Sequence, residues 1–277
     1  MTTFGNQKMV HDKKFRKLKE NLKRMERVLI AYSGGVDSTL LLKAASMSGL
    51  NDILAVTSSS ESMPKKELEF AKEQTISLHI KHRIIETDEL KNINYSSNPP
   101  ERCYYCKKEL FGRLSEIAEE EDYPFILDGT NLDDINDWRP GRQAAKEMNI
   151  TSPLLEAGLC KEDIRAISRE LGLPAWNRPS NPCLSSRFPY GQMITAGALR
   201  RVDLAEDFIR NLGVRELRVR DHSELARIEV PYNDFSLLLK EGIREQIVTY
   251  MKSLGYRHIT LDIRGFRSGS ANELLTK

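Results

Sequence analysis

The stretch Val28-Leu-Ile-Ala-Tyr32-Ser33-Gly34-Gly35-Val36-Asp37-Ser38-Thr39 decides how this chain folds. An apolar run typical of a buried strand ends at Tyr32, and a helical pattern continues after the loop through residues 40–45. Paired glycines let the backbone approach an anion closely, and the N–H groups and dipole at a helix start favour phosphate. The loop of residues 33–38, called the nucleotide loop below, therefore predicts nucleotide binding, although a Gly-Gly pair alone also fits a simple tight turn.

Several groups of the nucleotide loop suit a phosphate ligand. They are the backbone of Gly34 and Gly35 and the hydroxyl groups of Ser33, Ser38 and Thr39. Asp37 is an unusual neighbour for phosphate, so we expect it either to bind a bridging Mg²⁺ or to cap the helix. The Gly-x-x-x-x-Gly-Lys-Ser/Thr pattern of γ-phosphate loops is absent from the sequence.

Strand-like and helical patterns alternate outward from the nucleotide loop. Strands are expected at residues 28–32, 53–57, 83–86 and 125–128, and helices at about 62–78, 104–120 and 161–171. Such alternation predicts an α/β fold in which a parallel sheet carries helices on both faces. In such sheets ligands bind at the carboxyl ends of the strands.

A proline-rich stretch then interrupts the alternation. Residues 175–191 contain Pro179, Pro182 and Pro189, which predicts an irregular loop. Beyond it we expect helices at about residues 195–212 and 234–254 and strands at 216–220, 226–230 and 258–263. This order predicts a smaller α+β domain. We therefore divide the chain into an ATP-binding domain, residues 1–190, and a substrate-binding and oligomerisation domain, residues 191–277.

The overall composition limits the classes of function. The chain of 277 residues is 40% hydrophobic and can bury a core, and 42 basic against 40 acidic residues give a formal net charge of only +2. That balance argues against wholesale nucleic-acid binding, and the basic residues 13–24 fit the solvated face of a helix better than an RNA-contacting arm. No apolar run reaches the about 20 residues of a membrane span and no signal peptide opens the chain, so we expect a cytoplasmic protein.

The chain has four cysteines, which we expect to be reduced, metal-bound or catalytic in a cytoplasmic protein. Cys103-Tyr-Tyr-Cys106 opens a predicted helix, where both sulfurs can face one metal. A redox dithiol, a zinc site completed by Cys183 and Cys160, and four inert buried thiols all fit the pattern. An iron–sulfur cluster held by Cys103, Cys106 and Cys183 fits it as well.

The nucleotide loop resembles that of the pyrophosphatase-loop (PP-loop) superfamily of ATP-dependent adenylating enzymes, which includes GMP synthetase, NAD synthetase and tRNA-thiolating enzymes. The resemblance implies cleavage of ATP between its α- and β-phosphates, with release of pyrophosphate and transfer of AMP to a substrate oxygen. It also implies that the strand end Val56-Thr57-Ser58 holds adenine through backbone groups. Asp128-Gly129-Thr130 would then lie beside the α-phosphate or the ribose.

Further motifs extend the resemblance over almost the whole chain beyond residue 20. They are Leu127-Asp-Gly-Thr-Asn131, Asp137-Trp-Arg-Pro-Gly141, Cys183-Leu-Ser-Ser-Arg187-Phe-Pro-Tyr-Gly191, Arg218-Val-Arg220-Asp-His222, Ala226-Arg-Ile-Glu229 and Leu261-Asp-Ile-Arg-Gly-Phe-Arg-Ser-Gly269. Together they are similar to the ATP-dependent sulfur transferases of the LarE family, which mature the nickel-pincer cofactor of lactate racemase. One lineage of that family sacrifices the sulfur of a cysteine at the Cys183 position. A second lineage adds a Cys-x-x-Cys and holds a [4Fe–4S] cluster.

This chain carries both parts and so resembles the second lineage. The resemblance implies that Cys103, Cys106 and Cys183 are the cluster ligands, whereas Cys160 is left out and one iron stays open for sulfide. It further implies an anionic substrate, a pyridinium dicarboxylate mononucleotide. Sulfide or another sulfur donor would be a partner, and a homo-oligomer is expected.

The implied substrate needs fixed positive charge, and arginine guanidinium groups suit both phosphate and carboxylate. Arg218 and Arg220 alternate along a predicted strand and therefore share one of its faces. With Arg187 and Ser186 they are our candidates for substrate binding. We expect Glu229 to pair with one arginine or to position the ribose. The alternative is that both strand arginines lie on an ordinary solvent face.

We therefore expect an ATP-dependent sulfur transferase whose cofactors are ATP, Mg²⁺ and a [4Fe–4S] cluster. The catalytic candidates are Asp37, Cys183 and Arg187. Adenylation supplies AMP as a leaving group, which sulfide or the Cys183 thiolate displaces from the acyl carbon. A tRNA thiolase of the same superfamily and a zinc-stabilised adenylating ligase are the alternatives.

Overall fold

The computed structural model describes residues 3–135 and 139–267, so Asp137 and Trp138 of one motif and the final Ser268-Gly269 of another lie outside the described residues. The chain forms two compact units. The first comprises Met1–Ser60, Lys65–Glu89 and Glu101–Ser180, and the second comprises Glu61–Pro64, Leu90–Pro100 and Asn181–Lys277. This division differs from the boundary that we placed near residue 190. Two short segments join the second unit because they hydrogen-bond to the loop around Cys183.

The first unit contains a four-stranded parallel sheet. Its strands are β1 (Arg27–Ala31), β2 (Asp52–Ser59), β3 (Lys81–Glu86) and β4 (Phe125–Leu127), in the order β3-β2-β1-β4. The β1 strand is central because Ile30 pairs with Ala55 of β2 on one side and Leu127 of β4 on the other. The predicted α/β class is thus confirmed. The strands β2 and β3 follow on one side of β1, whereas β4 pairs with β1 on its other side, so the strand order reverses between β1 and β4.

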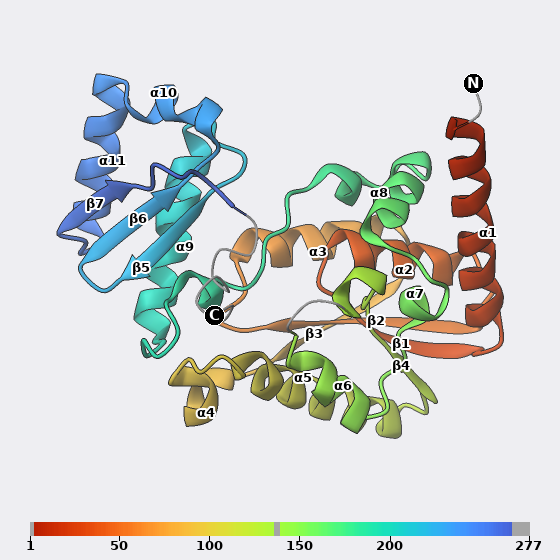
Figure 1. The fold of residues 1–277 in the computed structure, drawn as a ribbon. Coiled ribbons are helices and arrows are strands. Elements are labelled where there is room, and N and C mark those ends of the chain that lie inside the picture. Colours follow the sequence, from red (N-terminus) through yellow and green to blue (C-terminus); the bar gives the residue numbers. More distant parts are fainter. Residues whose placement is uncertain (1–2, 136–138, 268–277) are drawn as a thin grey trace. The chain divides into compact units, whose positions relative to one another are not determined.

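Helices cover both faces of this sheet (Figure 1). One face carries α1 (Thr3–Lys23), α2 (Val36–Ser46), α3 (Lys65–Ser77), α7 (Pro153–Glu156) and α8 (Lys161–Glu170), and the other carries α5 (Arg102–Glu120) and α6 (Gly141–Glu147). Side chains of β1 alternate between the two layers, because Val28 and Ile30 pack into the first core and Leu29 into the second.

The second unit is an α+β arrangement. It contains α4 (Ile93–Ser96), α9 (Ala196–Asn211), β5 (Arg218–His222), β6 (Leu225–Glu229), α10 (Phe235–Leu238), α11 (Glu241–Ser253) and β7 (His258–Leu261). The sheet order is β5-β6-β7, with an antiparallel first pair and a parallel second pair. The helix expected at about residues 234–254 is divided into α10 and α11, because Lys240 adopts an extended backbone conformation.

The proline-rich stretch is irregular, as its composition predicts. Within it the described backbone forms only the end of a short 3-10 helix, Pro174–Asn177, and a second one, Leu184–Arg187. Across residues 3–135 and 139–267, none of the helices combines the length and the apolar character needed to cross a bilayer.

Candidate active site

The nucleotide loop follows β1 and leads directly into α2. Gly34 has a φ of 75°, and a Cβ there would lie 3.3 Å from Cβ of Ala71, so both conformation and space favour glycine. The Ser38 hydroxyl accepts a hydrogen bond from the Ser33 N–H at 3.3 Å and donates one to the Gly35 carbonyl at 3.2 Å. These contacts hold the loop in a tight curve at the N-terminus of α2, where backbone N–H groups favour an anion.

The end of β4 lies against the nucleotide loop. A Cβ on Gly129 would lie 3.1 Å from the Ser38 nitrogen, so only glycine allows this approach without displacement. Asp128 shapes the turn, since its Oδ2 accepts the Thr130 hydroxyl at 2.6 Å and its Oδ1 accepts the Ser152 hydroxyl at 2.7 Å. The two loops therefore meet where the strand order reverses between β1 and β4, the position at which open α/β sheets bind ligands.

Asp37, on the first turn of α2, contacts two side chains from elsewhere in the first unit. It forms a short ion pair with Lys161 Nζ, and Asn131 Nδ2 donates to its Oδ1 at 3.3 Å. The Lys161 backbone N–H donates to Asp133 Oδ2 at 2.7 Å. Our sequence reasoning missed Lys161. The available signal was its position, because a lysine at the first residue of a helix opposes the helix dipole and so needs another reason to be there.

Thr57, at the expected adenine position, belongs to a buried hydrogen-bond relay. Its hydroxyl donates to the Tyr32 carbonyl at 2.8 Å, so it accepts from His82 Nε2, which lies 2.8 Å away. Burial and the nearby Lys72 lower the pKa of His82, which favours the neutral ring. Nδ1 of that ring lies 3.1 Å from the Thr75 hydroxyl, which donates to the Lys72 carbonyl at 2.9 Å. The relay ties β2, β3 and α3 to the carboxyl end of β1.

Thr39 and Ser58 differ in their exposure to solvent. We expected the Thr39 hydroxyl to face phosphate, but Thr39 is fully buried and its hydroxyl lies 3.2 Å from the hydroxyl of Tyr32. Burial raises the pKa of Tyr32 to about 12, so the phenol stays protonated. Thr39 therefore packs behind the loop, whereas Ser58 is part-exposed near the end of β2.

Cys103 and Cys106 lie near the N-terminus of α5 and Cys160 immediately precedes α8, all in the first unit, whereas Cys183 belongs to the second. None of the four forms a disulfide. Within the described parts of the chain, no three Cys, His, Asp or Glu side chains gather as a metal site. The Cys160 thiol instead donates to Asp163 at 3.1 Å. An i, i+3 pair of thiols on one helical turn does suit a shared metal.

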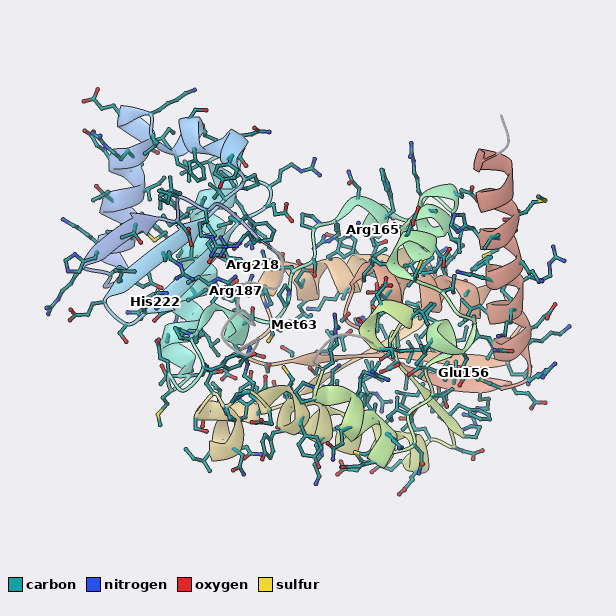
Figure 2. All side chains as sticks on the ribbon, viewed as in Figure 1. Met63, Glu156, Arg165, Arg187, Arg218 and His222 are labelled. Carbon is teal, nitrogen blue, oxygen red and sulfur yellow. The ribbon has the colours of Figure 1, made fainter. Side chains whose placement is uncertain are left out.

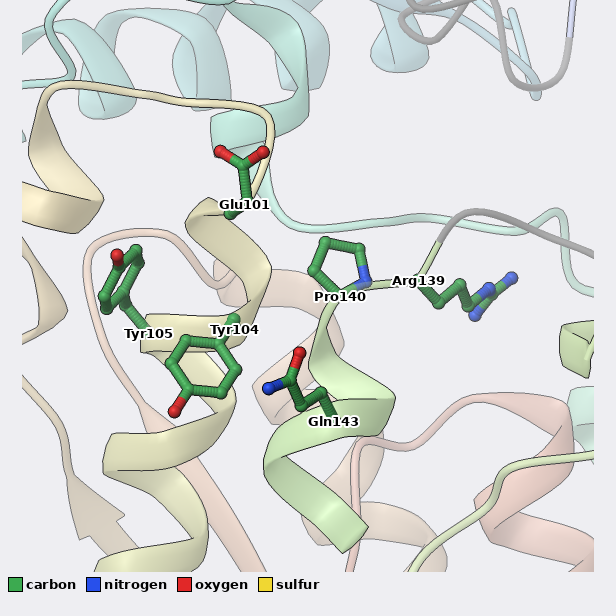
Figure 3. A pocket seen from close by; sticks show the side chains of 6 residues that line it. All are labelled: Glu101, Tyr104, Tyr105, Arg139, Pro140 and Gln143. Carbon is green, nitrogen blue, oxygen red and sulfur yellow. The ribbon is translucent and has the colours of Figure 1, made fainter. Parts of the chain in front are cut away.

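A pocket of about 470 Å³ opens beside the start of α5 (Figure 3). It is lined by Glu101, Tyr104, Tyr105, Arg139, Pro140 and Gln143. The start of α6 approaches α5 closely here, because a Cβ on Gly141 would lie 2.8 Å from Lys107 Cγ and 3.4 Å from the Cys103 carbonyl oxygen. The pocket therefore lies beside the turn that carries the cysteine pair, although neither cysteine lines it.

In the second unit, Arg187 is fully buried and anchors the loop around Cys183, residues 181–191. Its Nε and Nη2 donate to the Glu206 carboxylate at 2.8 and 2.9 Å. Its Nη1 donates to the carbonyls of Pro182 at 2.6 Å and Cys183 at 3.1 Å, and its Nη2 also donates to Asn181. We expected Arg187 to bind substrate. Its guanidinium is fully buried and bonds Glu206 and the loop carbonyls, which makes it the anchor of the Cys183 loop on α9, and a substrate contact for Arg187 stays a prediction.

Two segments that precede α3 and α5 also hold the Cys183 loop. The Leu184 N–H donates to the Ser62 carbonyl at 2.8 Å. Tyr95 and Ser185 share a 2.5 Å hydrogen bond between their hydroxyls, and Asn98 Nδ2 donates to the Pro189 carbonyl at 2.7 Å. These contacts explain why residues 61–64 and 90–100 belong to the second unit.

Arg218 and Arg220 share one face of β5, as their alternation predicts, but that face is not exposed to solvent. The two residues are only 6% and 7% exposed. Arg220 donates to Glu229 Oε2 from Nε and Nη2 at 3.0 and 2.9 Å, so the expected pairing of Glu229 is confirmed. Its Nη1 donates to the Ser186 carbonyl at 2.8 Å, which places Ser186 beside this face.

Positive charge accumulates around Arg218. Arg220 lies directly opposite Arg227 in the β5–β6 register, and Arg187 lies close to Arg218 (Figure 2). Burial and the repulsion of Arg187 lower the pKa of Arg218 to about 10, despite the opposing effect of Glu206. The guanidinium of Arg218 also lies 5.1 Å from the ring centroid of Phe266. We call Arg218, Arg220 and Arg227 the arginine face, and an anion would relieve its repulsion.

Comparison with known proteins agrees with this geometry. Residues 27–104 match the model of the family described as queuosine biosynthesis protein QueC. An uncharacterized protein of Synechocystis sp. is 43% identical over 267 residues, covering 96% of this chain and 99% of that protein. A pyridinium-3,5-bisthiocarboxylic acid mononucleotide synthase of Lactiplantibacillus plantarum is 40% identical over 260 residues, covering 92% of each chain. An uncharacterized protein of Methanocaldococcus jannaschii is 34% identical over 94% of this chain and 100% of its own.

The parallel sheet, with the nucleotide loop at the point where its strand order reverses, defines a PP-loop enzyme of the ATP-dependent sulfurtransferase and ligase class. The extent of the match narrows this class. The chain belongs to the LarE family, that of pyridinium-3,5-bisthiocarboxylic acid mononucleotide synthase.

Proposed function

We propose that the enzyme adenylates a carboxylate of pyridinium-3,5-biscarboxylate mononucleotide, releases pyrophosphate and replaces the activated oxygen by sulfur to give a thiocarboxylate. The observation that carries the ATP-dependent half is the close approach of Gly129 to the nucleotide loop. It brings the two loops together at the N-terminus of α2, where the strand order reverses and backbone N–H groups favour an anion. The synthase from Lactiplantibacillus plantarum, 40% identical, supports the thiocarboxylate product.

In this proposal the nucleotide loop binds the phosphates. The backbone of Gly34 and Gly35 and the hydroxyls of Ser33 and Ser38 donate to phosphate oxygens, while Asp37 binds Mg²⁺. Lys161 then exchanges its contact with Asp37 for the phosphates, because ATP brings more negative charge than one carboxylate. Adenine lies at the backbone groups of Thr57 and Ser58, and the His82 relay holds the Thr57 side chain against the carboxyl end of β1.

The arginine face binds the anionic substrate in the same proposal. Arg218 and Arg220 hold the phosphate of the mononucleotide, assisted by Ser186. Glu229 restrains Arg220 and Arg227 at once, since its two oxygens accept from both side chains, at 2.9 and 3.1 Å. This fixed geometry keeps the guanidinium groups in place before substrate arrives, which lowers the entropic cost of binding.

Cys103, Cys106 and Cys183 are the proposed ligands of a [4Fe–4S] cluster. The chemistry of the donor set fits, with two thiols on one helical turn and a third on an anchored loop. Connectivity supports their assembly, because the Asn98 carbonyl accepts the Gly191 N–H at 2.9 Å and Cys103 follows only five residues after Asn98. Such a cluster would supply an open iron that carries sulfide.

Product analysis tests the ATP-dependent half of the proposal. With α-labelled ATP and the pyridinium biscarboxylate mononucleotide, we expect labelled AMP together with pyrophosphate. Labelled ADP as the main product would contradict the assignment of a PP-loop reaction. Omission of the carboxylate substrate is the control, and it should leave ATP largely uncleaved.

Metal analysis of anaerobically purified variants tests the sulfur half. Cys→Ala substitutions at 103, 106 and 183 should each remove iron and sulfide, whereas Cys160→Ala should keep both. Loss of metal from Cys160→Ala would indicate a closed four-cysteine centre, and zinc without sulfide would favour an adenylating ligase. A mass loss of one H₂S at Cys183 after turnover would favour the sacrificial route, and co-purified RNA a tRNA thiolase.

A further inference from the structure

Asp163, the third residue of α8, is a buried carboxylate whose partners come from two helices. It is only 3% exposed. Its Oδ2 accepts the Cys160 N–H at 3.0 Å and Lys14 Nζ at 2.5 Å, while His11 Nδ1 lies 2.6 Å from its Oδ1. Burial alone would raise its pKa, but the hydrogen bonds from Lys14, Cys160 and His11 lower the pKa of Asp163 to about 2.

The α1 helix supplies the positive side of this contact. His11 and Lys14 are three residues apart and so lie on one helical face. The same helix packs against α2, α7 and α8 (Figure 1). It buries Leu18 and Leu22 in the first core. A buried carboxylate that loses its charged partners is strongly destabilised. The charge of Asp163 therefore ties α1 to the first turn of α8.

Lys161 occupies that first turn. Its own N–H is bound by Asp133, and the N–H of the preceding Cys160 is bound by Asp163. Two carboxylates thus hold two successive backbone N–H groups, those of Cys160 and Lys161. The direction of the Lys161 side chain toward Asp37 follows from this anchoring, because the Cα–Cβ bond direction is set by the backbone.

We propose that Asp163 is a positioning residue of the nucleotide site, and that α1 acts through it to hold Lys161 at the phosphates of ATP. The inference rests on the role of Lys161 in the proposed function. It also means that α1 helps to position an active-site residue, although α1 ends before residue 27, where the match to the QueC family begins. In this proposal Lys14 holds Asp163, Asp163 holds the start of α8, and the start of α8 sets the position of Lys161.

The test measures binding of a non-hydrolysable ATP analogue to the full chain by calorimetry. Lys14→Met should raise the dissociation constant by about threefold to tenfold, which lies in the lower part of the range that coupling between contacting residues produces. Lys14→Arg should recover most of the affinity, because it restores the charge beside Asp163. Lys13→Met is the matched control, since Lys13 is exposed on the same helix, and it should bind like the unmodified chain.

A double-mutant cycle separates positioning from a general loss of stability. In a Lys161→Met background, Lys14→Met should cause no further loss of affinity, whereas in a Ser33→Ala background its full effect should remain. An unchanged effect in the Lys161→Met background would overturn the inference. If Lys14→Met does not fold, His11→Gln replaces it in the same double-mutant cycle, because His11 also contacts Asp163.

The outcomes also separate this inference from the function on which it rests. Failure of the unmodified chain to bind the analogue would refute ATP binding itself. Normal binding by Lys161→Met would refute the phosphate contact of Lys161. Weak binding by Lys161→Met together with normal binding by both Lys14→Met and His11→Gln would refute only the role of Asp163 and α1.

Discussion

The Asp37 carboxylate on the first turn of α2 pairs with the Lys161 ammonium on the first turn of α8, although 124 positions separate them in the sequence. Both residues lie at helix N-termini, where the helix dipoles favour negative charge. The helix dipole therefore stabilises the charge of Asp37 and opposes that of Lys161. An anion in addition to Asp37 would offset this unfavourable effect on Lys161. Phosphate between the two helix starts would provide that anion.

We predict that Lys161→Met weakens ATP binding while the fold persists. A charge-assisted hydrogen bond contributes about 1.5–3 kcal/mol, so the dissociation constant should rise by about ten- to a hundredfold. Titration with a non-hydrolysable analogue measures this change. Lys146→Met, at an exposed position of α6, is the control and should bind normally. Equal affinities of the two variants would remove Lys161 from the nucleotide site.

For Arg187 we predict a structural effect before any catalytic one. Arg187→Met leaves the buried Glu206 without its main partner, and breaking a buried ion pair in this way costs about 3–5 kcal/mol. Urea denaturation of the variant should show a loss of this size. Arg215→Ala, at an exposed position in the same unit, should stay within about 0.5 kcal/mol of the unmodified chain. A small effect of Arg187→Met would instead return this residue to substrate binding.

The arginine face should show separate effects on stability and on substrate. Because Arg220 is buried and paired with Glu229, Arg220→Met should reduce stability by about 2 kcal/mol or more, beyond the range expected of a surface position. Arg218→Lys keeps the charge and should lower substrate affinity with a smaller loss of stability, since lysine cannot reproduce the guanidinium fork. Thermal denaturation and substrate titration of both variants give the comparison. Unchanged substrate affinity in both would leave the arginine face with a purely structural role.

Acid unfolding should report on Asp163. Its folded pKa of about 2 lies below the ordinary value of 3.8, so its stabilising effect is complete above the ordinary value and is lost as the pH falls through the folded one. That difference corresponds to about 2 kcal/mol. The free-energy gap between the unmodified chain and Asp163→Asn should therefore narrow by this amount between about pH 6 and pH 2. A gap independent of pH would show that the charge of Asp163 contributes no net stability.

Local patterns predicted much of the first unit. The apolar run that ends at Tyr32 predicts a strand, and the glycines that follow it predict a tight loop. Both predictions depend only on residues close in the sequence. The alternation of strands and helices likewise predicted the parallel sheet, since parallel strands need crossover helices. Lys240 shows the limit of this reasoning. Helical periodicity continues past it, but its extended backbone ends one helix and begins another.

Side-chain environment was harder to predict than backbone form. Thr39 lies within the predicted loop-to-helix junction, yet its hydroxyl packs against Tyr32 because the helical rotation turns it toward the core. Arg187 lies inside a motif that resembles a substrate site, yet Glu206 from α9 binds it. In each case the partner is distant in the sequence or faces the residue only after packing, and no local pattern records it.

The sequence by itself determined the nucleotide loop, the class of sheet around it and the family of the chain, because each depends on residues that are contiguous or evenly spaced. Only the tertiary structure decided that Lys161 meets Asp37, that the arginines of β5 are buried against Glu229, and that α1 contacts Asp163. Those pairings depend on which helix packs on which face. That choice is made by the summed burial of apolar side chains over the whole chain, so the position of a single charged residue in the sequence does not specify its partner.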